Sequence, residues 1–442
     1  MLGWVFGLGY FGFGVYWIHH SLYVHAAASW MFAALLTALL IMCLALYIAV
    51  FCTVFHQLQR RYDRSLVLSS LPLLWFVMEW SKGWVLSGFP WLSLGYAHID
   101  SPLAGFAPVI GVYGIGALSL WVSLGLVEAY QQRRPLPLLI PLIALVIGGA
   151  MKQIEWTRPL DRQLGVSMIQ ADIPQEIKWR HGDRQGILDR HWALTQSQWQ
   201  YDLIVWSESA IPGRQEDMQQ DYLEPMARVA EAQGSHLLAG IVVSNWLERE
   251  YFNSMLLLGA QQGVYHKRHL VPFGEYTPLR AWLGWIDSYL QIPMADMTPG
   301  ARDQPLIELD GITLGVSICF EDLFSRVINR DLPAANLLVN ASNDAWFGAS
   351  LAPHQHLQVA RMRALETGRV MVRSTNRGPG AFIDHRGKVI DATEQFQQQT
   401  LGATLQARTG ATPFVSYWRL QPYLTLLILL IVTGGLLRRT KA

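Results

Sequence analysis

The feature that most constrains this chain is where its charged residues begin. No Asp, Glu, Lys or Arg occurs from Met1 to Gln59, and the first such residue is Arg60. From about Gln153 to Arg408, by contrast, charged residues recur every few positions. Because charged side chains are unfavourable inside a bilayer, this distribution predicts a membrane-embedded N-terminal part followed by a polar domain.

Six apolar stretches are candidates for membrane helices, which need about 20 apolar residues to cross. They are Leu2–Ile18, Ala28–Phe55, Val67–Trp84, Leu103–Val127, Leu136–Met151 and Leu420–Leu437. Hydrophobic residues make up 51% of the chain and charged residues 15%, which is unusual for a soluble protein. We therefore expect a transmembrane helical domain of about five spans over residues 1–152, a catalytic domain over 153–412, and a closing membrane helix with a basic cytoplasmic tail over 413–442.

Lys and Arg in the short connections predict the orientation of the chain. Basic clusters at 60–64, 133–134 and 438–441 fall on the same side if all six stretches cross. Since such clusters favour the cytoplasmic side, the polar domain is expected on the opposite side of the membrane.

Short apolar runs in the polar half predict β-strands with helices between them. The runs are Leu164–Ile173, Leu203–Ser207, His236–Ser244, Ser254–Gly259, Ile312–Cys319, Leu337–Ala341 and Val370–Thr375. The clearest helix is predicted over His354–Thr367, with Gly368 as its stop, and Ala381–Asp391 has the pattern of a hairpin. Because most runs are apolar throughout, we expect an α/β domain whose sheets are covered on both faces.

Three segments of the polar half each place a reactive side chain at or beside strand-like residues. Glu208 follows a buried strand, where desolvation suits a general base. Lys267 lies beside apolar strand residues, where a fixed positive charge can stabilise an oxyanion. Cys319 lies between a strand and a helix start, where the helix dipole and nearby cations are expected to favour the thiolate. Each residue alone also has an ordinary structural explanation, so only the combination indicates thiol-based acyl transfer.

The order Glu, Lys, Cys on strand ends resembles the nitrilase, or carbon–nitrogen hydrolase, superfamily. The surrounding residues are similar to one family within it, the apolipoprotein N-acyltransferases. The segments are Trp206-Ser-Glu208-Ser-Ala-Ile-Pro212, Lys267-Arg-His-Leu-Val-Pro-Phe-Gly-Glu275-Tyr276, Ile318-Cys319-Phe-Glu321, Ser342-Asn-Asp-Ala-Trp-Phe-Gly348 and, in the membrane half, Trp84–Tyr96. The resemblance implies an α-helical transmembrane bundle joined to an α/β nitrilase-like domain, an αββα sandwich.

The resemblance also implies catalytic roles. Glu208 would take the thiol proton, Cys319 would be the nucleophile, and Lys267 would stabilise the tetrahedral oxyanion. The implied acyl donor is a membrane phospholipid, phosphatidylethanolamine, and the acceptor is the α-amino group of the S-diacylglyceryl-cysteine of a diacylated apolipoprotein. The implied location is the bacterial cytoplasmic (inner) membrane, with several spans and the catalytic domain on the periplasmic side.

Four further positions match the family in supporting roles. Glu275 matches an acidic residue that holds the lysine and the base in place, and Glu321 matches another acidic position just after the nucleophile. Trp179 and Asn253 match positions linked with the active-site region. An aromatic anchor at the membrane face is an equally good interpretation of Trp179.

Several classes of protein are not indicated. A net charge of +1 gives no support for a nucleic-acid partner, and the three cysteines have no metal-ligand spacing, so we expect neither a metal nor a cofactor. Two alternatives to the transferase remain: a membrane-anchored nitrilase or amidase-type hydrolase, and a non-catalytic membrane scaffold. The family usually carries two further apolar spans before the point where this sequence starts, and removing two adjacent spans leaves the predicted orientation unchanged.

Overall fold

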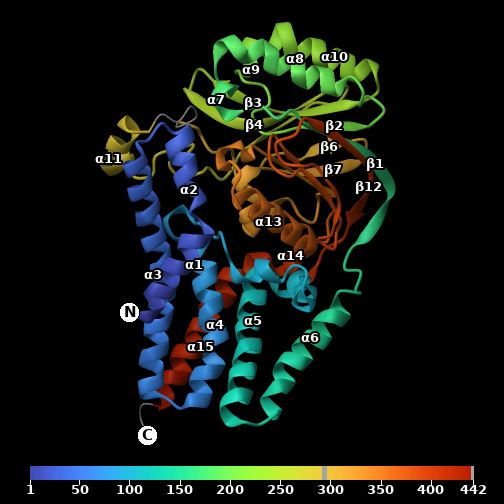
Figure 1. The fold of residues 1–442 in the computed structure, drawn as a ribbon. Helices are drawn as coiled ribbons and strands as arrows, with labels where there is room; N and C mark the ends of the chain where they lie inside the picture. The colour runs from blue at the N-terminus through green and yellow to red at the C-terminus, as the bar shows by residue number, and fades with distance from the viewer. Residues whose placement is uncertain (291–295, 440–442) are drawn as a thin grey trace. The chain divides into compact units, whose positions relative to one another are not determined.

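A computed structural model of the chain describes residues 1–290 and 296–439 (Figure 1). The chain divides into two compact units. The first comprises Met1–Tyr16, Ala34–Trp156 and Ala411–Ala442, and the second comprises Trp17–Ala33 and Thr157–Gly410. The last residues of the predicted basic tail, 440–442, lie outside the described residues.

The first unit is helical. Its main helices are α1 (Leu2–Gly14), α3 (Trp30–Arg61, with its first turn in the second unit), α4 (Arg64–Lys82), α5 (Ala107–Gln132), α6 (Leu139–Met151), α14 (Pro413–Tyr417) and α15 (Gln421–Arg439). Within the described residues, three helical segments are long and apolar enough to cross a membrane: Trp30–Arg61, Pro102–Gln132 and Pro413–Ile431. Two more apolar helices, Leu2–Gly14 and Leu136–Met151, are shorter.

The helix α4 corresponds to the predicted span Val67–Trp84, but it is not among the helices that are apolar enough to cross. It carries the buried pair Glu79 and Lys82, whose Oε1 and Nζ atoms are 3.3 Å apart. Glu79 also accepts a hydrogen bond of 3.0 Å from the backbone N–H of Leu94. The i, i+3 spacing places the two side chains on one face of the helix, and the ion pair lowers the apolar character of this helix.

The second unit contains two six-stranded sheets. The first has the order β12-β1-β2-β3-β4-β5, from β12 (Gln399–Thr409), β1 (Arg158–Gln170), β2 (Leu203–Trp206), β3 (His236–Asn245), β4 (Glu250–Leu258) and β5 (Gly263–His266). The second has the order β11-β10-β9-β8-β7-β6, from β11 (Val389–Ala392), β10 (Ala381–Ile383), β9 (Met371–Thr375), β8 (Leu337–Ser342), β7 (Ile312–Ile318) and β6 (Ile307–Leu309).

A single apolar cluster joins the two sheets, and helices cover their outer faces. Side chains of both sheets, such as Val205 of β2 and Val316 of β7, contribute to this cluster. The helices α8 (Arg184–Thr195) and α10 (Glu224–Ala232) pack on the first sheet, and α13 (Ala352–Thr367) packs on the second (Figure 1). This arrangement is the αββα sandwich expected from the sequence, with the predicted stop at Gly368 confirmed as a left-handed helix cap.

The pairing of the strands determines where the candidate site lies. Strand β2 is parallel to its neighbours β1 and β3, and β8 is parallel to β7 and β9. Parallel strands bring their carboxyl ends to the same edge of a sheet, and Glu208, Cys319 and Asn343 come within two residues of the ends of β2, β7 and β8. The antiparallel pair β4 and β5 adds Lys267, whose backbone N–H donates to the carbonyl of Asn253 at 2.8 Å.

The segment Trp17–Ala33 belongs to the second unit although it is distant from the rest of that unit in sequence. The Trp17 ring meets the Phe347 ring edge to face, with centroids 4.7 Å apart. The Ser21 hydroxyl donates to the backbone carbonyl of Trp346 at 2.7 Å. We expected this segment within the membrane domain, and the structure groups it with the sheets.

Candidate active site

Glu208 and Lys267 lie together in a buried polar cluster. The Lys267 Nζ atom is 3.4 Å from Glu208 Oε1 and 2.9 Å from Glu275 Oε1. The Asn253 side-chain amide donates to these same two carboxylate oxygens, at 2.8 Å each. Burial works to lower the pKa of Lys267, but Glu275 and Glu208 outweigh it and the pKa is raised. Lys267 is therefore a fixed positive charge held between two carboxylates.

The Glu208 carboxylate is fixed from three directions and keeps one free acceptor position. A carboxylate offers about four lone-pair directions. Oε1 accepts from Asn253 and Lys267, and Oε2 accepts from the backbone N–H of Asn343 at 2.9 Å. Within the part of the chain that the structure describes, no further donor reaches Oε2. This oxygen can therefore accept a proton without breaking the bonds that hold it.

Cys319 directly follows β7 in a sharp turn and is the first residue of a five-residue 3-10 helix, Cys319–Leu323. Its φ angle is +50°, a left-handed conformation that non-glycine residues rarely adopt. Such strain persists only where the surrounding structure imposes it. The turn therefore marks Cys319 as a residue that the fold holds in place.

The protonation state of Cys319 differs from the expectation. Burial is the main cause that raises the pKa of the Cys319 thiol, the Glu208 carboxylate raises it further, and Lys267 acts in the opposite direction. Lys267 therefore favours the thiolate, as expected of a nearby cation, but burial and Glu208 outweigh it and the pKa of the thiol is raised. A thiol whose pKa is raised needs a general base to form the thiolate.

Glu321 connects the loop after Lys267 to the turn at Cys319. Its Oε1 accepts from the backbone N–H groups of Arg268 and His269, at 2.7 and 2.9 Å. Its Oε2 accepts from the backbone N–H of Ile318 at 2.7 Å and from the Tyr265 hydroxyl at 2.9 Å. One side chain thus ties together the residues that flank the lysine and the cysteine.

Lys178 is a second buried lysine at the site that the sequence reasoning missed. Its Nζ atom donates to the backbone carbonyl of Glu208 at 3.0 Å. Burial lowers the pKa of Lys178 to about 8, while Glu208 and Cys319 act to raise it. One sequence signal could have indicated that Lys178 lies near the site: it directly precedes Trp179. Lys178 ends the short helix α7 (Gln175–Lys178), and Trp179 is half-buried. The predicted role of Trp179 in the active-site region stays a prediction.

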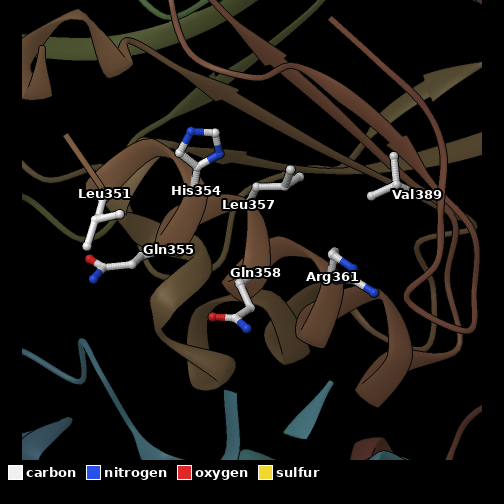
Figure 2. Close-up of a pocket in the computed structure, with 7 residues that line it drawn as sticks. All are labelled: Leu351, His354, Gln355, Leu357, Gln358, Arg361 and Val389. Carbon is white, nitrogen blue, oxygen red and sulfur yellow. The ribbon is translucent and has the colours of Figure 1, made fainter. Parts of the chain in front are cut away.

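A separate pocket with a volume of about 300 Å³ lies beside α13 (Figure 2). Its lining residues are Leu351, His354, Gln355, Leu357, Gln358, Arg361 and Val389. None of the seven predicted site residues lines it. Figure 2 shows His354 and Arg361 on the pocket side of this helix, so the pocket is distinct from the cluster around Cys319.

Two family models match the chain. Residues 165–414 match the carbon–nitrogen hydrolase family, which agrees with the two sheets, their helices and the buried cluster, so the second unit is a carbon–nitrogen hydrolase domain. Residues 1–125 match the N-terminal domain of apolipoprotein N-acyltransferase. Together with the relatives described next, these matches show that the chain belongs to the apolipoprotein N-acyltransferase family.

Curated relatives match over almost the whole chain. The apolipoprotein N-acyltransferase of Methylococcus capsulatus is 39% identical over 417 residues, which is 94% of this chain and 83% of that protein. The protein of the same name from Nitrosomonas europaea is 39% identical over 443 residues, covering 99% and 88%. The one from Photobacterium profundum is 35% identical over 448 residues, covering 98% and 86%. This family membership and the apolar helices together indicate a membrane protein.

Proposed function

We propose that this protein transfers an acyl chain from a membrane phospholipid to the α-amino group of the S-diacylglyceryl-cysteine of a lipoprotein, through a thioester on Cys319. The observation that carries the proposal is the half-buried Cys319 thiol, which interacts electrostatically with the Glu208 carboxylate and the Lys267 ammonium, two groups that lie 3.4 Å apart. The family supplies the substrates: its members are named for N-acylation of apolipoproteins. The phospholipid donor is phosphatidylethanolamine.

The first half-reaction forms the thioester. The free acceptor position of Glu208 Oε2 takes the thiol proton as the Cys319 sulfur attacks the ester carbonyl carbon. Lys267 stabilises the negative charge that forms on the carbonyl oxygen. The ester C–O bond then breaks, the proton on Glu208 passes to the leaving oxygen, and a lysophospholipid departs.

The second half-reaction transfers the acyl chain to nitrogen. The α-amino group attacks the thioester carbonyl carbon, and Glu208 takes one proton from the attacking nitrogen. The C–S bond breaks, the sulfur leaves as a thiolate, and Glu208 returns the proton to it. The products are an amide on the lipoprotein and the original Cys319 thiol.

The supporting residues act by holding these groups. Glu275 balances the charge of Lys267, and Asn253 fixes the separation of the two carboxylates because one amide group donates to both. Glu321 keeps the lysine loop beside the cysteine turn. Trp179 lies next to Lys178, which supports a place near the substrate more than an anchor at the membrane face.

We also propose a location for the reaction. The protein would cross the bacterial cytoplasmic membrane several times, with its carbon–nitrogen hydrolase domain in the periplasm. The basic clusters after α3 and α5 support this orientation. Both substrates are anchored in the membrane by lipid chains, so attached apolar helices would keep the enzyme in the same layer.

The deciding experiment is intact-protein mass spectrometry of purified protein incubated with phosphatidylethanolamine and no acceptor. We expect the mass of one acyl chain to be added, no such addition in Cys319→Ala, and release of the chain when a diacylated lipopeptide is supplied. An adduct that decays equally fast without the lipopeptide would identify a hydrolase instead. A folded wild-type protein that never gains the acyl mass would contradict the proposal and favour a non-catalytic scaffold.

A further inference from the structure

Four charged side chains form a fully buried cluster next to the Cys319 turn. They are Asp322, Asp344, His356 and Arg373, and each is 0% exposed. His356 Nε2 is 2.9 Å from Asp322 Oδ1, and Nδ1 is 3.3 Å from Asp344 Oδ1. Arg373 lies 2.8 Å from Asp344 Oδ2 and 3.6 Å from Asp322 Oδ2. We call these four residues the buried charge cluster.

The buried charge cluster contacts the backbone of Cys319 directly. His356 Nε2 lies 3.3 Å from the Cys319 carbonyl oxygen, and the Asn340 amide donates to the same oxygen at 3.2 Å. Arg373 in turn donates to Asn340 at 2.8 Å. Two donors therefore hold the carbonyl of Cys319, the residue with the strained φ angle of +50°. One donor, His356, belongs to the cluster, and the other, Asn340, is fixed by Arg373 of the cluster.

The surroundings of His356 require a doubly protonated ring. Each ring nitrogen faces a carboxylate oxygen, and a neutral imidazole can donate from only one nitrogen. Burial and Arg373 act to lower the pKa of His356, but Asp322 and Asp344 outweigh them and the pKa is raised. With an imidazolium the cluster holds two negative and two positive charges, so its net charge is zero.

A neutral ring would leave one uncompensated negative charge close to the sulfur. Asp344 is already among the groups that raise the pKa of the Cys319 thiol. An unbalanced carboxylate would oppose thiolate formation further, because like charges repel strongly where water is excluded. The positive charge of His356 therefore favours loss of the Cys319 thiol proton, the same proton that Glu208 must remove.

We propose that His356, as an imidazolium, is a positioning residue that holds the Cys319 turn and keeps the buried charge cluster neutral so that the thiolate can form. This inference rests on the proposed role of Cys319 as the nucleophile. It assigns a function to a residue that does not touch the substrate and acts only through the cysteine.

The test measures the reactivity of Cys319 without any lipid. Full-length protein in detergent is treated with iodoacetamide over a range of pH, and peptide mass spectrometry follows alkylation of Cys319 separately from Cys43 and Cys52. The variants are His356→Gln and the double variant His356→Gln/Asp322→Asn, which restores a net charge of zero. The matched control is His354→Gln on the same helix, where His354 is exposed at the pocket of Figure 2.

We expect His356→Gln to be alkylated about tenfold more slowly at a given pH, with its rate profile displaced to higher pH. The double variant should recover to within about threefold of the wild type, and His354→Gln should match the wild type. A residue with a purely structural role would make the double variant at least as slow as the single one, and that result would overturn the inference. An unchanged profile in folded His356→Gln would overturn it as well.

Two further measurements distinguish the role of His356 from a folding defect and from failure of the proposed transferase. If His356→Gln does not fold, the double variant is compared with the wild type alone, and alkylation about tenfold slower would refute the inference. The acyl adduct with phosphatidylethanolamine is measured on the same samples. A wild type that is alkylated as described but gains no acyl chain would refute the proposed transferase and leave the role of His356 supported.

Discussion

Replacing Glu321 with glutamine should separate the lysine loop from the cysteine turn while changing one atom of the side chain. The two oxygens of Glu321 accept four hydrogen bonds of 2.7 to 2.9 Å, three from residues that flank Lys267 and one from Ile318 beside Cys319. Glutamine keeps one oxygen and places an NH₂ donor where the other oxygen was. With the NH₂ at the Oε1 position, the backbone N–H groups of Arg268 and His269 face another donor. With the NH₂ at the Oε2 position, the N–H of Ile318 does so, while the Tyr265 hydroxyl can turn to accept from the NH₂.

The size of the effect follows from the more favourable orientation, which leaves one buried N–H without an acceptor. A buried donor without an acceptor is unfavourable by about 1–3 kcal/mol, so Glu321→Gln disfavours the clamped arrangement by about that amount. If about 2 kcal/mol of this is lost from the transition state, acylation slows about 30-fold. Because Lys267 and Cys319 themselves are unchanged, the loss reflects their placement.

The assay is rapid-quench mass spectrometry of acyl-enzyme formation at pH 8 with phosphatidylethanolamine in excess. Thermal unfolding of the same samples shows that the variant is folded. The matched control is Glu308→Gln, since Glu308 is an exposed glutamate on β6, and it should be acylated at the wild-type rate. Acylation of folded Glu321→Gln within about threefold of the wild type would refute the clamp.

Three other outcomes are expected. Burial raises the pKa of Glu321 to about 7, although Lys267 and the donors that hydrogen-bond to Glu321 act to lower it. Acylation of the wild type should therefore slow as the pH falls through about 7, because a protonated carboxyl accepts fewer hydrogen bonds. The Glu321→Gln variant should lack this decline. Alanine at Cys43 and Cys52, both on α3, should leave the acylation rate unchanged, and a lost adduct would contradict the assignment of Cys319 as the only acylated thiol. A phosphatase reporter fused after residue 152 should be active and one fused after residue 64 inactive, and the opposite pattern would reverse the orientation.

The strands that the sequence predicted well are those with a strong local signal. The apolar runs at β2, β7 and β8 marked buried strands because every residue of β2 and β8 is covered. Strand β6 has only three residues, too few to show a pattern. Strand β12 was missed because its inward side chains alternate leucine with alanine at Leu401, Ala403, Leu405 and Ala407, and alanine makes the alternation weak.

The helix α13 shows where sequence reasoning about the site ends. His354 and His356 are two positions apart, so on a helix they point to nearly opposite sides. The sequence alone does not indicate which of them faces the core. Only the long-range contacts of His356 with Asp322 and Asp344 decide this, and those contacts depend on how β8, the helix and the cysteine turn meet.

Lys178 illustrates the same limit for a charged residue. Lysine is seldom fully buried, so an isolated lysine in the sequence is normally taken as a surface residue. Here it is buried against the backbone of Glu208, 30 positions away. The order Glu, Lys, Cys was visible because three strand ends repeat one design, whereas Lys178 lies in a short helix without such a pattern.

The discontinuity of the second unit has a consequence for how the protein is made. Because chains are synthesised from the N-terminus, Trp17–Ala33 emerges long before Phe347 and Trp346, the residues on which it packs. The segment Trp17–Ala33 must therefore wait through most of translation and can pack on Trp346 and Phe347 only when the second sheet has formed. A gene fragment that encodes only residues 157–410 would yield a domain without the Trp17 ring that contacts Phe347. A catalytic fragment should therefore include residues 17–33 as a separate or grafted segment.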